Sequence, residues 1–541
     1  MMNYHRRETV TVNVGGVLLG SAYPVRVQSM TNTDTLDVER SAAQCERIAQ
    51  AGGEIVRLTA QGVRQAESIG MIRNLLRRQG CQVPLVADIH FNPRAAFAAA
   101  ALTDKVRINP GNFVDPARTF KTLEYTPEEY AAELQRIHDA LVPFIALCRE
   151  HGTAVRLGVN HGSLSDRIMS RYGNTAAGMV ESVMEFLRVF VAEGFNDLVV
   201  SMKASNVVVM VEAVRRVVAA MDAEGMRFPL HLGVTEAGFG EDGRIKSAVG
   251  IGTLLSEGLG DTIRVSLSED PELEIPVARK LVTYVASRAG HPHIEGQLSK
   301  GYDPLCPPQR QRRLVGGVST PLVVMDCDPS LITGALKPDF YGPTLPAEVL
   351  VIEPHNVNVP GSLLAQLHQL ADEGNTRPVV ARVRYDDDDL EWLQVKAGAD
   401  LGPVVMSGLV DGIWIDAPHY ARQDEVVSIA FGILQSARVR MSKTEFISCP
   451  SCGRTMFDLQ TTVKRVQQAT AHLTHLKIGV MGCVVNGPGE MADADYGYVG
   501  AARGRISLYK GKECIEKNIP EEEAIDRLVN LIKAAGDWKE P

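Results

Sequence analysis

Short runs rich in valine, isoleucine and leucine recur through the first 290 or so residues, and amphipathic stretches separate them. Stretches such as 127–150 and 176–194 have the spacing of apolar positions that is typical of helices. The apolar runs read as buried strands, at 24–30, 54–59, 84–90, 105–109, 154–160, 197–203, 230–236 and 261–267. Eight strand–helix repeats predict a (β/α)8 TIM barrel over residues 1–290. The alternative, a doubly wound sheet, would need fewer strands or a different ending.

The alternation resumes after a segment rich in proline, glycine and charge at 291–313, which reads as a linker. Buried strands are predicted at PLVVMDCD, AEVLVIEP, RPVVARVRY and GIWID, so we expect an inserted α/β middle domain over 291–440 with a structural role. Its acidic tract DDDDLE (386–391) is interpreted as a solvated helix start, since acidic residues suit helix N-termini, rather than as a metal site. Residues 441–541 predict a small α/β module with three clustered cysteines.

Composition narrows the class of protein. A length of 541 residues suits about three domains, and the formal net charge of −9 argues against a nucleic-acid binder. No run of 18 apolar residues predicts a membrane span, and the first residues lack the apolar core of a signal peptide, so we expect a cytoplasmic protein. Nine cysteines, an odd number, favour free thiols or metal ligands over disulfides.

Basic residues recur at equivalent places in the predicted barrel strands. In five strands an arginine stands between apolar neighbours: Arg26, Arg57, Arg107, Arg156 and Arg264. The other three strands end in Lys203, in Asp88 with His90, and in Thr235 with Glu236. Strand alternation allows the arginines to point inward while their neighbours pack against helices. Barrel active sites lie at the carboxyl ends of the strands, so we predict a site for a phosphate or diphosphate there.

Two further features support an anion site. Asn109, Asn160, Ser205 and Ser266 follow the basic residues closely and would complete the hydrogen bonds. A glycine-rich stretch at 236–252 opens a helix, and barrel phosphate sites often use such a helix N-terminus.

The clustered cysteines indicate a metal or redox site. Cys449 and Cys452 form a C-x-x-C pair, and Cys483 follows 31 residues later. The pair alone fits zinc, an iron–sulfur cluster or a redox dithiol. A fourth ligand would come from Cys514 or from Glu490, an oxygen ligand that is more readily displaced than a thiolate.

The motifs together resemble those of the 4-hydroxy-3-methylbut-2-enyl diphosphate synthase family of the non-mevalonate isoprenoid pathway. The matching motifs occur in order along the chain: RVQSMTNTDT (26–35), ADIHFNP (87–93), VRINPGN (106–112), RLGVNHGSL (156–164), SMKAS (201–205), GVTEAG (233–238), 246–267, CPSCGR (449–454) and GCVVNGPGE (482–490). Residues 291–440 have no counterpart in shorter members, so the chain is similar to the long form of the family.

This resemblance implies the site and its chemistry. It implies a [4Fe–4S] cluster held by Cys449, Cys452, Cys483 and Glu490. The resemblance also implies that the Glu490 carboxylate leaves its iron when substrate binds. It assigns diphosphate binding to Arg57, Arg107, Arg156, Lys203, Arg264 and Ser266. It places Asp88, Asn109, Asn160, Thr235 and Glu236 in an inner shell around the rest of the substrate. Glu236 is expected to donate a proton. Arg26 is predicted from the strand pattern alone.

The implied reaction is a two-electron reductive dehydration that opens the ring of 2-C-methyl-D-erythritol 2,4-cyclodiphosphate. No nicotinamide or flavin motif is evident, so flavodoxin or ferredoxin is the expected electron donor. In short members the barrel of one subunit meets the cluster module of its dimer partner. A homodimer is therefore possible, but the inserted domain would also allow both parts to meet within one chain.

Two other classes of function compete with this interpretation. One is a non-redox barrel enzyme for a phosphorylated substrate with a structural zinc module. The other is an iron–sulfur carrier or sensor in which the barrel is only a scaffold.

Overall fold

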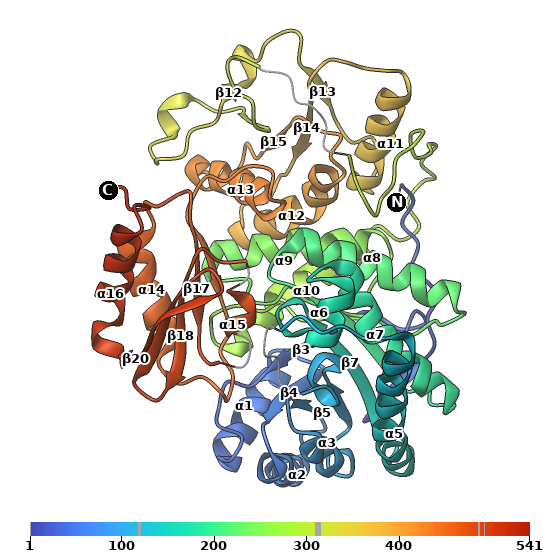
Figure 1. The fold of residues 1–541 in the computed structure, drawn as a ribbon. Coiled ribbons are helices and arrows are strands. Elements are labelled where there is room, and N and C mark those ends of the chain that lie inside the picture. The colour runs from blue at the N-terminus through green and yellow to red at the C-terminus, as the bar shows by residue number, and fades with distance from the viewer. Residues whose placement is uncertain (1, 117–120, 309–314, 485–486, 492, 541) are drawn as a thin grey trace.

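The chain forms an N-terminal barrel, a middle α/β domain and a C-terminal α/β module (Figure 1). The computed structural model describes residues 2–116, 121–308, 315–484, 487–491 and 493–540. The predicted domain boundaries, 290/291 and 440/441, fall between α10 (Glu274–Ala286) and β11 (Leu322–Met325) and between α13 (Gln423–Ser436) and β16 (Glu445–Ser448). This division stays a prediction.

The barrel is an eight-stranded parallel sheet in the order β8-β7-β6-β5-β4-β3-β10-β9. A parallel bridge between Val200 and Leu230 joins its outer strands and closes the ring. The strands are β3 (Arg26–Met30), β4 (Ile55–Ala60), β5 (Leu85–Ile89), β6 (Lys105–Ile108), β7 (Ala154–Asn160), β8 (Leu198–Lys203), β9 (His231–Leu232) and β10 (Thr262–Ile263). The predicted TIM barrel is confirmed, and each predicted strand is present, although β9 and β10 are shorter than expected.

A helix follows each barrel strand and packs on the outside of the ring (Figure 1). These helices are α1 (Val38–Gln50), α2 (Val63–Arg78), α3 (Pro93–Ala100), α5 (Pro127–His151), α7 (Ala176–Ala192), α8 (Val207–Ala223), α9 (Gly240–Ser256) and α10. Shorter turns lie in the loops at the carboxyl ends of the strands: α4 (Pro110–Phe113), η1 (His161–Ser163), α6 (Asp166–Tyr172) and η2 (Pro271–Leu273).

The amino-terminal hairpin, β1 (Val12–Val14) and β2 (Val17–Leu19), is antiparallel. Its Val12, Val14 and Leu19 form one buried apolar cluster with residues at the start of four barrel strands, Ile55, Val86, Ala154 and Val199. The hairpin therefore covers the end of the barrel opposite the predicted site.

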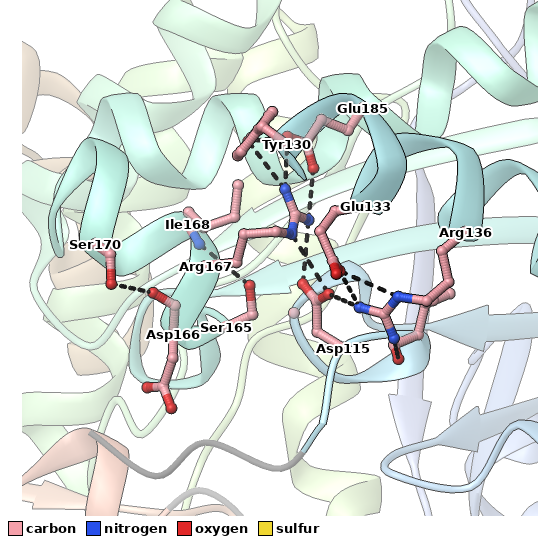
Figure 2. A network of polar contacts seen from close by, with 12 residues as sticks. Asp115, Tyr130, Glu133, Arg136, Ser165, Asp166, Arg167, Ile168, Ser170 and Glu185 are labelled. Carbon is pink, nitrogen blue, oxygen red and sulfur yellow. Dashed lines mark hydrogen bonds and ion pairs between the residues drawn. The ribbon is translucent and has the colours of Figure 1, made fainter. Parts of the chain in front are cut away.

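A buried ion network braces the loops after β6 and β7 (Figure 2). Arg167, 3% exposed, donates to Asp115 at 3.1 Å and to Glu185 at 2.7 Å. The hydroxyl of Tyr130 also accepts a hydrogen bond from Arg167, at 2.9 Å. Because two carboxylates and one guanidinium are satisfied together, the network fixes α6 against α7 and against the loop that follows α4.

The middle domain is a five-stranded parallel sheet in the order β12-β11-β15-β14-β13. Beside β11, its strands are β12 (Phe340–Tyr341), β13 (Leu350–Ile352), β14 (Val379–Arg384) and β15 (Gly412–Asp416), and its helices are α11 (Val359–Asp372), α12 (Leu390–Met406) and α13, with the turns η3 (Pro329–Leu331) and η4 (Gly342–Thr344). The four strands that the sequence predicts are β11, β13, β14 and β15.

Helices α12 and α13 lie between this sheet and the barrel (Figure 1). A Cβ on Gly398 of α12 would lie 2.7 Å from Cβ of Ala248 on α9, so the two helices meet closely. Asp389 caps α12 by accepting from the amide of Trp392 at 2.7 Å, which confirms the acidic tract as a helix start. The tract also reaches the barrel, where Lys280 pairs with Asp389 at 3.0 Å.

The C-terminal module is a mixed five-stranded sheet in which β16, β17 (Lys477–Met481) and β18 (Tyr496–Ala502) are parallel. The strands β19 (Arg505–Lys510) and β20 (Glu513–Pro520) continue it as antiparallel neighbours. Its helices are α14 (Leu459–Thr470), α15 (Gly487–Glu490) and α16 (Glu521–Ala534). Figure 1 shows α14 and α16 on the outer side and α15 turned toward the barrel.

Within the described residues, no helix combines the length and apolar character needed to cross a bilayer.

Candidate active site

A cavity lies between the carboxyl ends of the barrel strands and the C-terminal module, and it brings most of the predicted residues together. The barrel supplies Met30, Arg57, Asp88, His90, Arg107, Arg156, Asn160, Lys203, Thr235, Glu236, Arg264 and Ser266. The module supplies Cys449, Pro450, Ser451, Cys452, Arg454, Thr455, Met481, Gly482, Cys483 and Gly487. Basic side chains and thiols therefore line one cavity, although they lie far apart in the sequence.

Five barrel residues, Arg57, Arg107, Arg156, Lys203 and Arg264, form what we call the cation ring. Two of its members are held by carboxylates. Arg107 donates to Asp88 at 3.1 Å, and Arg264 makes a bidentate pair with Glu274 at 2.8 and 2.9 Å. Since charged hydrogen bonds of this kind fix both partners, Asp88 and Glu274 orient the guanidinium groups at the mouth of the barrel.

The positive charge of the cation ring exceeds the negative charge beside it. Burial lowers the pKa of Lys203 well below its ordinary value, and Arg57 and Arg156 lower it further. Burial alone would raise the pKa of Asp88, but Arg57 and Arg107 outweigh it and hold that pKa well below its ordinary value. An anionic ligand would relieve this repulsion.

Several buried guanidinium nitrogens lack hydrogen-bond partners among the described residues. These are Nη2 of Arg156, Nε of Arg107, and Nε and Nη1 of Arg454. Buried polar groups are nearly always paired in folded proteins, so unpaired donors around a cavity indicate a ligand with several acceptor oxygens. A phosphate group has this chemistry.

The structure corrects the prediction for Arg26. Its guanidinium pairs with Glu54 at 2.8 Å and donates to the carbonyl of Leu18 at 3.1 Å. Arg26 begins β3, whereas Met30, level with Arg57 in the sheet, ends it. At about 3.3 Å per residue, Arg26 lies roughly 13 Å toward the opposite end of the barrel. The prediction that it joins the ring is wrong.

Three other predicted residues, Asn109, Ser205 and Glu490, do not line the cavity. Ser205 forms a hydrogen bond with Glu490. Asn109 caps α4 by accepting from the amide of Gly111 at 3.1 Å, and its Nδ2 donates to Ser163 at 2.8 Å. Glu490 is 4% exposed and ends α15, three residues after the cavity-lining Gly487. A Cβ on Gly489 would lie 1.9 Å from the carbonyl oxygen of Gly162, so α15 rests directly on η1.

The thiols and Glu490 match the donor set of an iron–sulfur cluster. Cys449, Cys452 and Cys483 line the same cavity, and Oε1 of Glu490 has no hydrogen-bond partner among the described residues. In the described part of the chain, no three Cys, His, Asp or Glu side chains converge as ligands of a single metal ion. Thiolates that hold a [4Fe–4S] cluster bind different irons and need not converge on one point. The residues present therefore fit such a cluster.

Two residues that line the cavity have a strained backbone. Glu236 has a φ of 48° and Ser451 a φ of 63°, both in the left-handed region that favours glycine. Strained residues of this kind are often found at functional sites, where the surrounding structure holds them. One of these residues belongs to the barrel and the other to the C-x-x-C segment, and both line the same cavity.

Sequence reasoning gave no role to three residues that the structure places at the site, although it noted His90 at the end of its strand. His90 contacts Arg107, and burial together with that guanidinium lowers the pKa of His90 to about 3, so the imidazole is neutral. Glu274 holds Arg264, and Arg454 reaches Asp88 at 3.4 Å. His90 and Arg454 stand within the motifs ADIHFNP and CPSCGR, which was the available signal; Glu274 had none.

Comparison with known proteins agrees with this geometry. Residues 9–279 match the family model of the GcpE TIM-barrel domain, and residues 445–534 match that of the GcpE protein C-terminal domain. The chain belongs to the GcpE family. The models leave the middle domain unmatched, as expected for a segment inserted between the two conserved parts of a GcpE protein.

Curated relatives extend this match to the whole chain. The 4-hydroxy-3-methylbut-2-en-1-yl diphosphate synthase (flavodoxin) of Bacteroides fragilis is 53% identical, with 100% of this chain and 97% of the relative covered. Proteins of the same name from Porphyromonas gingivalis and Chlorobaculum tepidum are 47% and 37% identical over 100% of this chain, and 99% and 90% of those proteins are covered. The middle domain is therefore shared with these GcpE relatives.

Proposed function

We propose that the protein converts 2-C-methyl-D-erythritol 2,4-cyclodiphosphate to 4-hydroxy-3-methylbut-2-enyl diphosphate, a two-electron reductive dehydration in the non-mevalonate isoprenoid pathway. The relatives that share its full length carry the name of this synthase. Their names also specify flavodoxin, and we propose flavodoxin as the electron donor of this chain.

One observation carries the proposal: the cation ring and three cysteine thiols face each other across one cavity. The ring suits a diphosphate, which accepts charged hydrogen bonds at several oxygens. The thiols suit a redox-active cluster. A non-redox barrel enzyme with a structural zinc would not need its metal ligands in the substrate cavity.

Cys449, Cys452, Cys483 and Glu490 would hold a [4Fe–4S] cluster. Such a cluster, when bound, supplies electrons and a Lewis-acidic iron next to the substrate. Its carboxylate ligand would be bound less tightly than the thiolates, because oxygen is the harder donor.

The chain's own residues would bind, orient and protonate the substrate. Arg57, Arg107, Arg156, Lys203, Arg264 and Ser266 would hold the diphosphate, while Asp88, Asn160 and Thr235 would orient the carbon skeleton. Glu236, 2% exposed, would donate the proton that the leaving hydroxyl group requires. The module covers the barrel mouth and would exclude water from the reaction.

Anaerobic purification with iron, sulfide and turnover assays tests this function. We expect a brown protein that contains iron and sulfide and converts the cyclic diphosphate when reduced flavodoxin is supplied. Replacing Cys449, Cys452 or Cys483 by serine is expected to abolish both colour and turnover. Cys514, whose thiol donates to the carbonyl of Glu516 in β20, is the matched control, and Cys514→Ser is expected to preserve both. A colourless protein that contains zinc but no sulfide would favour the zinc alternative.

A cytoplasmic location and a homodimer stay predictions.

A further inference from the structure

Arg454 is the guanidinium that the C-terminal module places in the cavity. It follows Cys452 by two residues, in the segment between β16 and α14, and is 7% exposed. Among the described residues that line the cavity, every other lysine or arginine belongs to the barrel. Arg454 therefore faces the cation ring from the opposite wall.

The hydrogen bonds of Arg454 are incomplete. Its Nη2 lies 3.4 Å from Oδ2 of Asp88, and Asp88 also accepts from Arg107 at 3.1 Å. Its Nε and Nη1 are buried and have no hydrogen-bond partner among the described residues. One carboxylate thus serves guanidinium groups from both walls of the cavity, and the thiol of Cys452 is a further hydrogen-bond partner of Arg454. The Nε and Nη1 donors are available to a ligand.

Gly453, the residue before Arg454, determines where the Arg454 side chain enters the cavity. A Cβ on Gly453 would lie 2.6 Å from the carbonyl oxygen of Thr33 and 2.7 Å from Oγ1 of Thr59. Only glycine allows this approach to the loop after β3 and to β4. Contact between module and barrel at Gly453 therefore places the guanidinium of Arg454 beside Asp88.

We propose that Arg454 binds a phosphate group of the substrate from the module side, so that substrate binding and docking of the module onto the barrel stabilise each other. The free Nε and Nη1 of this guanidinium can each donate a charged hydrogen bond to a phosphate oxygen. An anion that contacts both walls makes the two equilibria mutually dependent, since such coupling is reciprocal. The identity of the anion as the cyclic diphosphate rests on the proposed function.

Calorimetry on the oxidised holoenzyme tests the contact, because without a reductant the substrate binds but does not react. Arg454→Gln is expected to weaken binding of the cyclic diphosphate about ten- to a hundred-fold, as expected for loss of a charged hydrogen bond. Arg454→Lys keeps the charge and is expected to lose less. Arg465, exposed on α14 of the same module, gives the matched control, and Arg465→Gln is expected to bind as the wild type does. Iron and sulfide contents equal to the wild type exclude cluster loss as the cause.

Hydrogen exchange tests the coupling. In the wild type, ligand is expected to slow exchange of the β16 amides, where Ser448 bridges to Ala237 of the barrel. In Arg454→Gln, saturating ligand is expected to bind without this added protection. A role as a salt-bridge partner alone predicts reduced protection without ligand and unchanged affinity.

Affinity within two-fold of the wild type in both Arg454 variants would overturn the contact, and normal ligand-induced protection in Arg454→Gln would overturn the coupling. Failure of the proposed function would look different. The wild type itself would then neither bind nor convert the cyclic diphosphate, while inorganic diphosphate as probe would still report on Arg454.

Discussion

Arginines that look alike in the sequence have different partners in the barrel. Arg264 and Glu274 are 3% and 1% exposed and form a bidentate pair. Arg156 donates instead to the hydroxyl of Ser201 at 3.1 Å, and its Nη2 has no partner among the described residues. Removing one member of a buried ion pair leaves an uncompensated charge, whereas removing an unpaired cation does not.

We therefore expect Arg264→Met and Arg156→Met to fail in different ways. Arg264→Met is expected to cost about 3–5 kcal/mol of stability, because Glu274 is left buried without its partner. Arg156→Met is expected to be at least as stable as the wild type but to bind the diphosphate about ten- to a hundred-fold more weakly. Denaturant unfolding and calorimetry check the two outcomes. Equal loss of stability in both variants would contradict the distinction.

Lys105 predicts a pH dependence of stability. It begins β6, is fully buried, and its Nζ has no partner among the described residues. Burial, followed by Arg156 and Arg57, lowers its pKa from 10.5 to about 7. Between these values the unfolded chain binds more protons than the folded one, so stability rises with pH across this window.

Lys105→Met is expected to abolish this pH dependence of stability. It is also expected to raise the free energy of unfolding at pH 7 by about 1–3 kcal/mol, because burying a polar group without a partner costs about that much. Denaturant unfolding at pH 7 and pH 9 measures it. A wild type whose stability does not change over this range relative to Lys105→Met would show that Lys105 has its ordinary pKa.

The proposed role of Glu236 as proton donor gives a prediction about turnover. It lines the cavity with a strained backbone, at a φ of 48°. Glu236→Gln keeps the size and hydrogen bonds of the side chain but removes its acidic proton. Turnover is expected to fall by about 10²-fold or more, with normal cluster content and near-normal affinity. Glu224→Gln, at the exposed end of α8, is the control. Retention of most turnover would reject the acid role, and loss of binding would favour a structural ion pair.

At the scale of elements, hydrophobic periodicity was sufficient to locate the barrel strands and four of the five middle-domain strands, because each of these forms a short buried run. It missed β12, a half-buried strand of two residues. It could not place residues along the barrel axis. Arg26 and Arg57 both stand between apolar residues in the sequence, but the parallel register pairs Arg26 with Thr262 and pairs Arg57 with Met30. The alternation of side chains along a strand shows which of them point into the barrel. Their position along the barrel axis depends on the register between strands, which the sequence of a single strand does not show.

Contacts between elements that are distant in the sequence could not be predicted either. The pairing of Arg264 with Glu274 depends on how η2 returns over the barrel mouth, and that of Arg454 with Asp88 depends on docking of the module. Asn109 was predicted to face substrate, but it holds Ser163 in the loop against which α15 rests.

Helix α15 and η1 meet through glycines, which gives a prediction for these elements. A Cβ on Gly489 would clash with the carbonyl oxygen of Gly162, so Gly489→Ala is expected to push Glu490 out of place. Turnover is expected to fall about 10²-fold, the usual effect of a 1 Å misplacement, while the barrel remains folded. Gly62→Ala, whose Cβ would meet the ends of two side chains, Gln65 at 3.3 Å and Asn92 at 3.7 Å, is the control. Comparable turnover in the two variants would show that this contact is dispensable.

At the scale of the whole molecule, the barrel and the module of one chain contact each other directly. Lys246 pairs with Glu445 at 2.8 Å, and the hydroxyls of Ser268 and Ser448 lie 2.7 Å apart. The middle domain is anchored to the barrel by Arg288, which pairs with Asp400 at 2.7 Å with both side chains buried. The arrangement therefore brings the two halves of the candidate site together without a second subunit.

A complementation experiment distinguishes a site within one chain from a site shared between subunits. Arg156→Met disables the barrel half of the site, and Cys452→Ser disables the module half. If subunits exchanged modules, each dimer containing one chain of each variant would rebuild one of its two sites, so such dimers would recover about half of the sites. Because the contacts above lie within one chain, we expect no recovery of turnover in protein co-expressed with two different tags and purified through both. Wild type co-expressed with either variant is the positive control, since it retains intact chains under both arrangements. Recovery of turnover in the doubly tagged protein would mean that the modules are exchanged, and the middle domain would then act as an arm that reaches the partner.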